Sequence, residues 1–203
     1  IWQMLWLADN DEKRISRGVA KGDKQAMRKL YDLVAGSISS ACCRYVANDD
    51  DAKDVAQDTF LSIITHIGDF EYRGKGSLRA WATRIAINKA VNFMRKQDRQ
   101  LLSVKEELLS DKSLNAVEVE SNLALQDLYD IDADQLHAFI RSLPDGYRTV
   151  FNLYAIDGKS HSEIAQLLGI SESTSASQYH RAKVLLAKKI TNYLSQKSTS
   201  YEY

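Results

Sequence analysis

An aromatic ring, two amides and two guanidinium groups recur along one predicted helix. At about 100° per residue they share one stripe, made of Trp81, Arg84, Asn88, Asn92 and Arg95. The opposite side of the helix is mainly apolar. Guanidinium groups bind phosphates, amides pair with base edges, and an indole ring stacks on unpaired bases. The stripe therefore indicates a nucleic-acid surface, and the alternative is a solvated face on which Trp81 is half-buried core.

The loop before this helix adds further basic and aromatic side chains. Tyr72, Arg73 and Lys75 lie among glycines, and Ser77 is the predicted N-cap of the helix. A flexible basic loop beside Trp81 suits a flipped or unstacked base. Duplex sequence can be read without aromatic side chains, so the loop favours a single strand as the ligand.

A second predicted helix, beginning at Asp49, carries acid on its solvent side. Its outer stripe consists of Asp54, Gln57, Asp58 and Leu61. Carboxylates repel phosphates, so we do not expect this face to contact nucleic acid. It suits a basic protein partner, and a plain solvated face is an equal alternative. The inner side is expected to bury Val55, Ala56, Phe60, Ile63, Ile64 and Ile67.

The most specific local pattern lies near the C-terminal end. Ser160 with Glu163 predicts a capping box, Gly169 fits a left-handed helix end, and Ser171 caps a further helix. This spacing predicts a helix-turn-helix. The side chains expected to face outward and contact DNA are Ser171, Ser173, Thr174, Ser177, Gln178 and Arg181. The alternative is a three-helix packing module with an incidental capped turn.

Composition predicts an all-α fold. The chain has 203 residues, 44% of them hydrophobic, with one Pro and nine Gly. We expect two small helical domains, at 17–100 and 135–195, joined by an acidic linker at 101–134, with the second a helix-turn-helix domain. Residues 17–48 should form helices interrupted near Gly36.

The formal net charge of zero hides a strong segregation along the chain. Residues 73–99 carry eight basic side chains and one acidic, whereas residues 49–71 carry seven acidic and one basic. Residues 101–134 hold two lysines and nine carboxylates. Each segment is thus suited to a different kind of partner.

Several function classes are not expected. The four His are dispersed without ligand spacing, and no phosphate loop or nucleophile motif occurs, so we expect no metal, no cofactor and no enzyme activity. Cys42 and Cys43 are adjacent and read as reduced thiols. No run of 18 apolar residues or secretory signal is seen. The expectation is a soluble, cytoplasmic protein without membrane insertion.

The chain resembles the extracytoplasmic-function (ECF) sigma factors, the small two-domain class of bacterial transcription initiation factors. The stretches that carry this resemblance are 51–70, 72–96 and 143–186. The resemblance covers most of the chain outside its ends and linker. It implies a factor that binds core RNA polymerase, directs it to specific promoters, melts the minus-ten element and initiates transcription.

The resemblance also implies roles for particular residues. Asp54, Gln57, Asp58 and Phe60, with Leu61 at the edge, would dock on the beta prime clamp helices. Trp81, Arg84, Asn88 and Asn92, with the loop from Tyr72 to Ser77, would open the minus-ten element and capture a base. The helix-turn-helix would read the minus-thirty-five element, and the linker would thread through polymerase channels. Further implied partners are the beta flap and an anti-sigma factor.

One departure from the family pattern concerns the predicted recognition helix. Where many members have a basic residue, a branched apolar residue and an arginine, this chain has Ser175, Ala176 and Gln178, and it keeps Arg181. Fewer guanidinium contacts imply weaker phosphate attraction and a different base preference.

Two other classes remain open. One is a stand-alone repressor or activator that uses the helix-turn-helix, with residues 17–100 as a dimerisation or ligand domain. The other is a structural helical adaptor, for which neither Trp81 nor Arg181 would matter to DNA.

Overall fold

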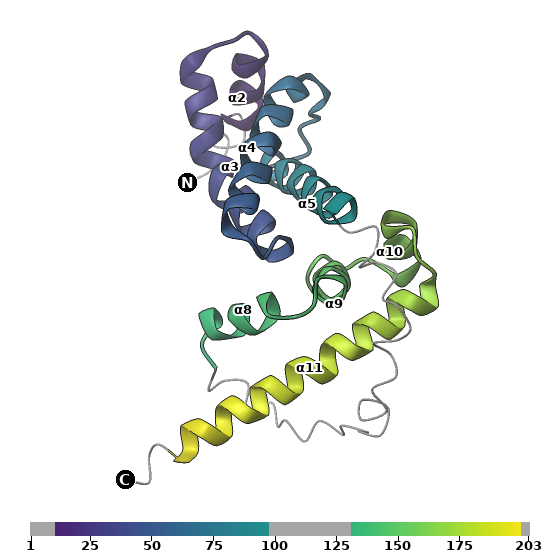
Figure 1. Cartoon of the computed structure of the whole chain (residues 1–203). Coiled ribbons are helices and arrows are strands. Elements are labelled where there is room, and N and C mark those ends of the chain that lie inside the picture. Colours follow the sequence, from purple (N-terminus) through teal and green to yellow (C-terminus); the bar gives the residue numbers. More distant parts are fainter. Residues whose placement is uncertain (1–10, 98–130, 200–203) are drawn as a thin grey trace. The chain divides into compact units, whose positions relative to one another are not determined.

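The protein is helical throughout the part that the structure, a computed structural model, describes. This part comprises residues 11–97 and 131–199, and it contains no strand (Figure 1). The all-α prediction is thereby confirmed for these residues. The chain divides into two compact units between Phe93 and Met94. The N-terminal segment 1–10 and most of the predicted linker lie outside the described residues.

Among the residues that the structure describes, the first unit contains four helices and one short 3₁₀ turn, and the last of these helices continues past Phe93 to Gln97. Its elements are α2 (Asp11–Ala20), α3 (Lys24–Tyr45), α4 (Asp49–Thr65), η1 (Ile67–Asp69) and α5 (Ser77–Gln97). α3 packs against both α2 and α4, and η1 packs against α2 and α4. The predicted domain start at residue 17 falls inside α2.

The predicted helix interruption near Gly36 is wrong, because α3 runs through this residue without a break. A glycine costs about 1 kcal/mol in a helix interior, and burial of Val34 and Ile38 on the same helix outweighs that cost. The chain instead breaks at Gly22, whose φ is +78°. Asp23 then caps α3 by accepting a backbone N–H through its carboxylate.

α4 begins at Asp49, as the run of acidic residues there predicts. Asn48 is the N-cap, and its side-chain oxygen accepts hydrogen bonds from two backbone N–H groups of the first turn, at 2.9 and 3.0 Å. Carboxylates in this turn are favourable because the N-terminal end of a helix is partly positive. Val55, Ile63 and Ile67 are buried as expected, whereas Ala56, Phe60 and Ile64 are only half-buried.

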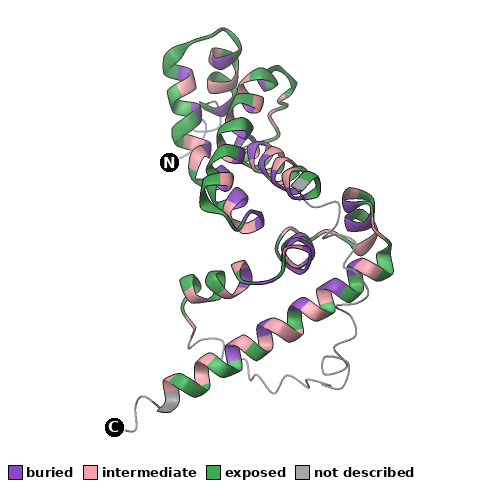
Figure 2. Ribbon diagram, viewed as in Figure 1, coloured by how far each residue is buried: buried purple, intermediate pink, exposed green. Residues whose placement is uncertain are grey.

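The second unit contains the helices described from residue 131 onward. They are α8 (Ala133–Arg141), α9 (Asp145–Phe151), a π-helical turn η3 (Asn152–Ile156), α10 (His161–Leu168) and α11 (Glu172–Thr199). Its core joins Ile140, Leu143 and Tyr147 to Ala182 and Leu186 of α11. Buried residues recur along α11 (Figure 2), because this one helix packs against α8, α9 and α10.

The helix-turn-helix signals are confirmed in this unit. The Glu163 carboxylate accepts the Ser160 N–H at 2.8 Å, and the Ser160 hydroxyl accepts the Glu163 N–H at 3.2 Å. The backbone bond from Ser160 is also the main reason why the pKa of Glu163 is lowered. Gly169 ends α10 with φ +71°, and the Ser171 hydroxyl accepts the Thr174 N–H at 3.0 Å. The turn between α10 and α11 is therefore set by local hydrogen bonds.

A buried arginine holds the start of this unit together. Arg148 is 1% exposed, and its guanidinium donates to the carbonyls of Arg141 and Leu143 at 3.1 and 3.0 Å. It also forms an ion pair with Asp145. These bonds fix the end of α8 to α9 around the break at Pro144.

Candidate nucleic-acid and protein interfaces

The predicted polar stripe of α5 faces outward. A buried series at four-residue spacing, Leu78, Ala82, Ala86, Ala90 and Met94, fixes which side of the helix packs inward. As a result Arg84, Asn88, Asn92 and Arg95 are exposed on the other side. The predicted orientation of these four side chains is confirmed.

Trp81 is half-buried on the same stripe. Its ring packs on Phe70, with ring centroids 5.6 Å apart and the planes inclined by 54°. Phe70 lies between η1 and α5 and was not singled out from the sequence. The aromatic surface offered by this unit is therefore a pair of rings from two segments rather than one indole.

The loop before α5 has the backbone form that its glycines predict. Gly74 and Gly76 have φ values of +119° and +90°, which side chains other than glycine rarely adopt. Lys75 is exposed between these two glycines, Arg73 is exposed just before Gly74, and Tyr72 is half-buried. The loop thus presents Lys75 and the ion pair of Arg73 with Glu71, whose Nη2 and Oε2 atoms are 3.1 Å apart, next to the stripe of α5.

The predicted N-cap at Ser77 is wrong, because Ser77 is the first residue of α5 and its side chain does not cap it. The Glu12 carboxylate takes this role. It accepts the N–H of Gly76 at 2.7 Å and the N–H of Leu78 at 2.9 Å, while the Ser77 hydroxyl donates to it at 3.3 Å. A carboxylate at this end also interacts favourably with the helix dipole.

A cavity of about 470 Å³ lies on the α2 side of the loop. Lys13 and Arg17 of α2 line one wall, and Phe70 and Tyr72 line the other. The Lys13 Nζ lies 4.6 Å from the centre of the Tyr72 ring. The Glu71 carboxylate also lines this cavity, so its lining mixes cationic, aromatic and acidic side chains.

The acidic face of α4 is exposed along its predicted stripe. Asp54, Gln57, Asp58 and Leu61 are all exposed, and Leu61 retains 64% of its accessible surface. Phe60 is half-buried and contacts Tyr31 of α3 edge to face, with centroids 5.3 Å apart. Tyr31 is itself 55% exposed, and the sequence did not mark it. The face therefore combines carboxylates with exposed apolar groups, as protein-binding surfaces often do.

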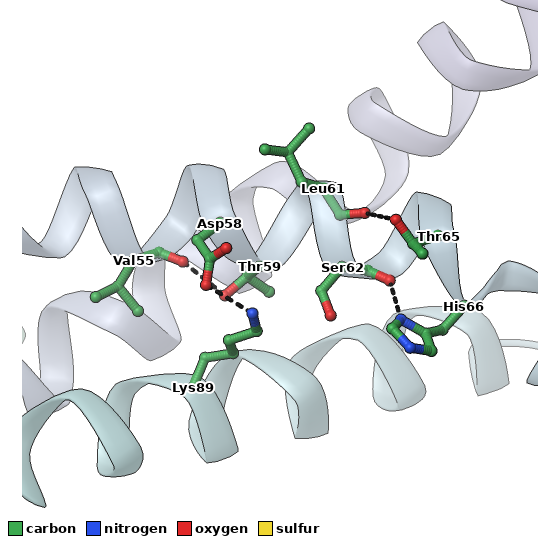
Figure 3. Close-up of polar contacts among 8 residues, drawn as sticks. All are labelled: Val55, Asp58, Thr59, Leu61, Ser62, Thr65, His66 and Lys89. Carbon is green, nitrogen blue, oxygen red and sulfur yellow. Dashed lines mark hydrogen bonds and ion pairs between the residues drawn. The ribbon is translucent and has the colours of Figure 1, made fainter. Parts of the chain in front are cut away.

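Asp58 of this acidic face is tied to α5. Its Oδ2 lies 2.6 Å from the Nζ of Lys89, and Figure 3 shows the two side chains meeting between the neighbouring helices. The Lys89 side chain was not among the predicted site residues. Its ion pair with Asp58 links the acidic face to α5.

The predicted recognition helix, α11, places most of its expected side chains outward. Ser171, Ser173 and Ser177 are exposed, and Thr174 and Arg181 are half-buried. The Ser171 hydroxyl is shared with those of Ser173 and Thr174, each at 2.8 Å. Ser171, Ser173 and Thr174 lie at the start of the helix, where a recognition helix contacts base edges.

Gln178 is the exception, and its predicted outward orientation is wrong. It is 3% exposed, and neither its amide oxygen nor its amide nitrogen has a hydrogen-bond partner. It follows Ser175 by three positions and precedes Ala182 by four, and both of these are fully buried. Gln178 therefore continues the buried side of α11.

An aromatic and polar cluster joins α10 to α11. His161 stacks on Tyr154, with centroids 4.4 Å apart, and its Nδ1 lies 2.9 Å from the hydroxyl of the buried Ser175. Tyr179 packs on Tyr154 at 4.5 Å. The packing of α11 against α10 therefore includes the polar contact between His161 and Ser175 in addition to apolar contacts.

No metal site is found among the residues that the structure describes, since no three His, Cys, Asp or Glu side chains group suitably. In the same residues, no helix is both long and apolar enough to span a membrane. Cys42 is buried, which raises the pKa of its thiol to about 11 and disfavours the reactive thiolate.

Two protein families match this chain. The Sigma-70 region 2 family matches residues 30–100, and the Sigma-70 region 4 family matches residues 133–186. These two ranges contain α4 and α5 on one side and the helix-turn-helix on the other.

Individual relatives are similar over nearly the whole chain. The ECF RNA polymerase sigma factor SigW of Bacillus subtilis (strain 168) is 30% identical over 189 residues, covering 88% of this chain and 96% of that protein. The ECF RNA polymerase sigma-E factor of Haemophilus influenzae is 28% identical over 189 residues, covering 89% and 95%. Among solved structures, the sigma factor RpoE from Bartonella quintana, in complex with the anti-sigma factor NepR, matches with 20% identity and a TM-score of 0.46. That match covers 81% of this chain and 96% of the RpoE chain.

Proposed function

Since this chain belongs to the ECF RNA polymerase sigma factors, which direct core RNA polymerase to promoters, we propose how its surfaces divide that work. Its relatives are transcription initiation factors rather than catalysts. We propose that residues 17–100 form the domain for polymerase docking and the minus-ten element. Residues 135–195 form the domain for the minus-thirty-five element, and residues 101–134 form the linker.

The acidic face of α4 is the proposed docking surface for the beta prime clamp helices. Its residues are Asp54, Gln57, Asp58, Phe60 and Leu61. Exposed carboxylates beside exposed apolar groups support this assignment, because such a face repels DNA and fits a basic protein. The beta flap is the proposed partner of the second domain.

The proposed minus-ten surface combines α5 with the loop before it. Its residues are Tyr72, Arg73, Lys75, Ser77, Trp81, Arg84, Asn88, Asn92 and Arg95. The observation that carries the proposal is that α5 exposes four cationic and amide side chains on one side, next to Lys75 and the Glu71-paired Arg73 of the loop. That arrangement fits phosphates and unpaired bases.

The proposed minus-thirty-five surface is the start of α11. It comprises Ser171, Ser173, Thr174, Ser177 and Arg181. Gln178 has no place in it, because a side chain that is 3% exposed does not reach a base edge. Arg181 is the one cation among these five residues, so this surface attracts phosphates weakly.

Docking on the polymerase then explains how two weak DNA contacts can together hold the promoter. Held on the polymerase at a fixed separation, the two contacts become effectively intramolecular and reinforce each other. Strand separation is driven by contacts made only with the open DNA, in which stacking of one unpaired base contributes about 1–3 kcal/mol. Nucleotide hydrolysis by this protein is not required. The proposed location is the cytoplasm, where polymerase and DNA meet, and an anti-sigma factor is a proposed further partner.

Filter binding with a pool of genomic promoter fragments tests the proposal, with and without core polymerase. A sigma factor retains specific fragments only when core polymerase is present. A stand-alone repressor would retain fragments with a symmetric site tightly without polymerase. A structural adaptor would make no difference to retention in either condition.

A further inference from the structure

Lys89 lies where the proposed docking surface meets the proposed minus-ten surface. Its Nζ is 2.6 Å from the Oδ2 of Asp58, which belongs to the docking surface (Figure 3). On α5, Lys89 directly follows Asn88 and precedes Asn92 by three residues, a spacing that makes side chains neighbours on a helix surface. Lys89 therefore borders the stripe proposed to face DNA, while its ammonium group is paired with Asp58 of α4.

This ion pair is open to competition from both sides. The Asp58 side chain is 64% exposed and the Lys89 side chain is 33% exposed. Exposed pairs are weak, because water and salt screen them. A basic protein surface can take the carboxylate, and a DNA phosphate can take the ammonium group, which has three donors on a flexible stem.

We propose that Lys89 is an additional phosphate-binding residue of α5 that Asp58 holds in the free protein. When a basic surface of the polymerase engages Asp58, the ammonium group is released to the single-stranded DNA beside Asn88 and Asn92. Docking on α4 thereby raises the DNA affinity of α5 without any movement of the helices. This inference rests on the proposed function, since it needs α4 to dock and α5 to bind DNA.

The same helix offers a matched control. Asp50 and Lys53 form an exposed pair within α4, with the Nζ 2.9 Å from Oδ1 and with the side chains 89% and 70% exposed. Asp50→Asn removes the same charge from the same helix as Asp58→Asn does. It frees a lysine that lies on α4 rather than on α5.

The test measures binding of the full chain to a labelled single-stranded oligonucleotide of random sequence, by fluorescence anisotropy over a range of salt concentrations. Phosphate contacts carry no sequence information, so no promoter sequence is needed. We expect Asp58→Asn to tighten binding about threefold or more and to steepen the log–log salt slope by about 0.7, the value for one added phosphate contact on a single strand. Adding Lys89→Gln should remove both changes, and Asp50→Asn should cause neither.

Two results would overturn the inference. One is an equal gain in Asp50→Asn and Asp58→Asn, which would be a general effect of lowered negative charge. The other is a gain that persists when Lys89→Gln is added to Asp58→Asn, which would mean that another group binds the phosphate.

Trp81→Ala separates this inference from the proposed function. If Trp81→Ala weakens binding to the oligonucleotide but the Asp58 and Lys89 variants do not differ, the inference fails and the minus-ten surface stands. If Trp81→Ala has no effect on this binding or on promoter opening by the holoenzyme, the minus-ten assignment itself fails.

Discussion

The Glu12 carboxylate accepts the backbone N–H of Leu78 at 2.9 Å, although 66 positions separate the two residues. Its other oxygen accepts the N–H of Gly76 at 2.7 Å. α2 therefore determines where α5 begins, and with it the placement of the basic loop and of Trp81. A helix that lies outside both proposed DNA surfaces thus positions one of them.

Glu12→Ala should leave these two N–H groups without their acceptor. Loss of a cap costs about 0.5–2 kcal/mol, so we expect the free energy of unfolding of the first unit to fall by about 1–2 kcal/mol. Urea unfolding followed by tryptophan fluorescence measures this, since Trp81 lies in that unit and the second unit contains no tryptophan.

The matched control is Asp11→Ala, which removes the neighbouring carboxylate. Asp11 is exposed and pairs with Arg14 on the same helix, so the expected change is below about 0.5 kcal/mol. Equal losses in the two variants would show that Glu12 acts through charge on α2 and not as the cap of α5.

Trp81→Ala combined with Asn88→Ala should abolish promoter melting but preserve polymerase binding. The double variant removes an aromatic surface and an exposed amide from the proposed minus-ten surface, and it leaves α4 intact. Permanganate footprinting of the holoenzyme on promoter DNA reports unpaired thymines. Normal melting by the double variant would exclude the assigned role.

Asp54→Arg combined with Asp58→Arg should reduce the affinity for core polymerase. Both side chains are exposed on α4. Two arginines at these positions would place positive charge against a basic partner, which is strongly unfavourable. Recovery of core enzyme in a pull-down with the tagged factor measures the effect. Asp50→Arg is the control on the same helix, and recovery that is unchanged in the double variant would refute the docking role.

Gln178→Met should stabilise the second unit. A buried polar group without a partner costs about 1–3 kcal/mol, and methionine fills a similar volume without polar amide atoms. We expect slower hydrogen exchange of the backbone amides of α10 and α11. Gln166→Met, at an exposed position of α10, is the control.

The same variant distinguishes a core role from a DNA-binding role. Gln178→Met should leave promoter affinity of the holoenzyme unchanged, whereas Arg181→Ala should lower it. A loss of affinity in Gln178→Met comparable to that in Arg181→Ala would mean that the glutamine turns outward on DNA.

The stability of the first unit should fall in alkaline solution because of Cys42. Burial raises the pKa of this thiol from 9.0 to about 11, so the folded state favours the protonated form. The associated stability is complete below pH 9 and is lost as the pH rises to about 11. Urea unfolding over this range should show the loss in the wild type and in Cys43→Ala, and a smaller loss in Cys42→Ala.

Features that depend on near neighbours in the sequence were predictable. The capping box of Ser160 and Glu163, the left-handed Gly169 and the outward stripe of α5 each follow from residues within a few turns of one helix. Hydrogen bonds at helix ends and the 100° rotation per residue act over that short range, so the pattern alone specifies them.

Gln178 shows where helical spacing stops being decisive. It lies about 60° around the helix from the buried Ser175 and about 60° from the half-buried Arg181. A residue at such a boundary is buried or exposed according to what packs beside it. Gln178 is buried because α9 and α10 pack on α11.

The composition, charge segregation and helix periodicity of this chain were sufficient to determine the all-α class, the helix-turn-helix and the two surfaces of opposite charge in the first unit. The tertiary structure alone decided that Glu12 caps α5, that Phe70 supports Trp81 and that Asp58 holds Lys89. Each of these contacts joins residues that the chain brings together only on folding. A hydrogen bond or ion pair depends on distance in space, and no local pattern encodes that distance.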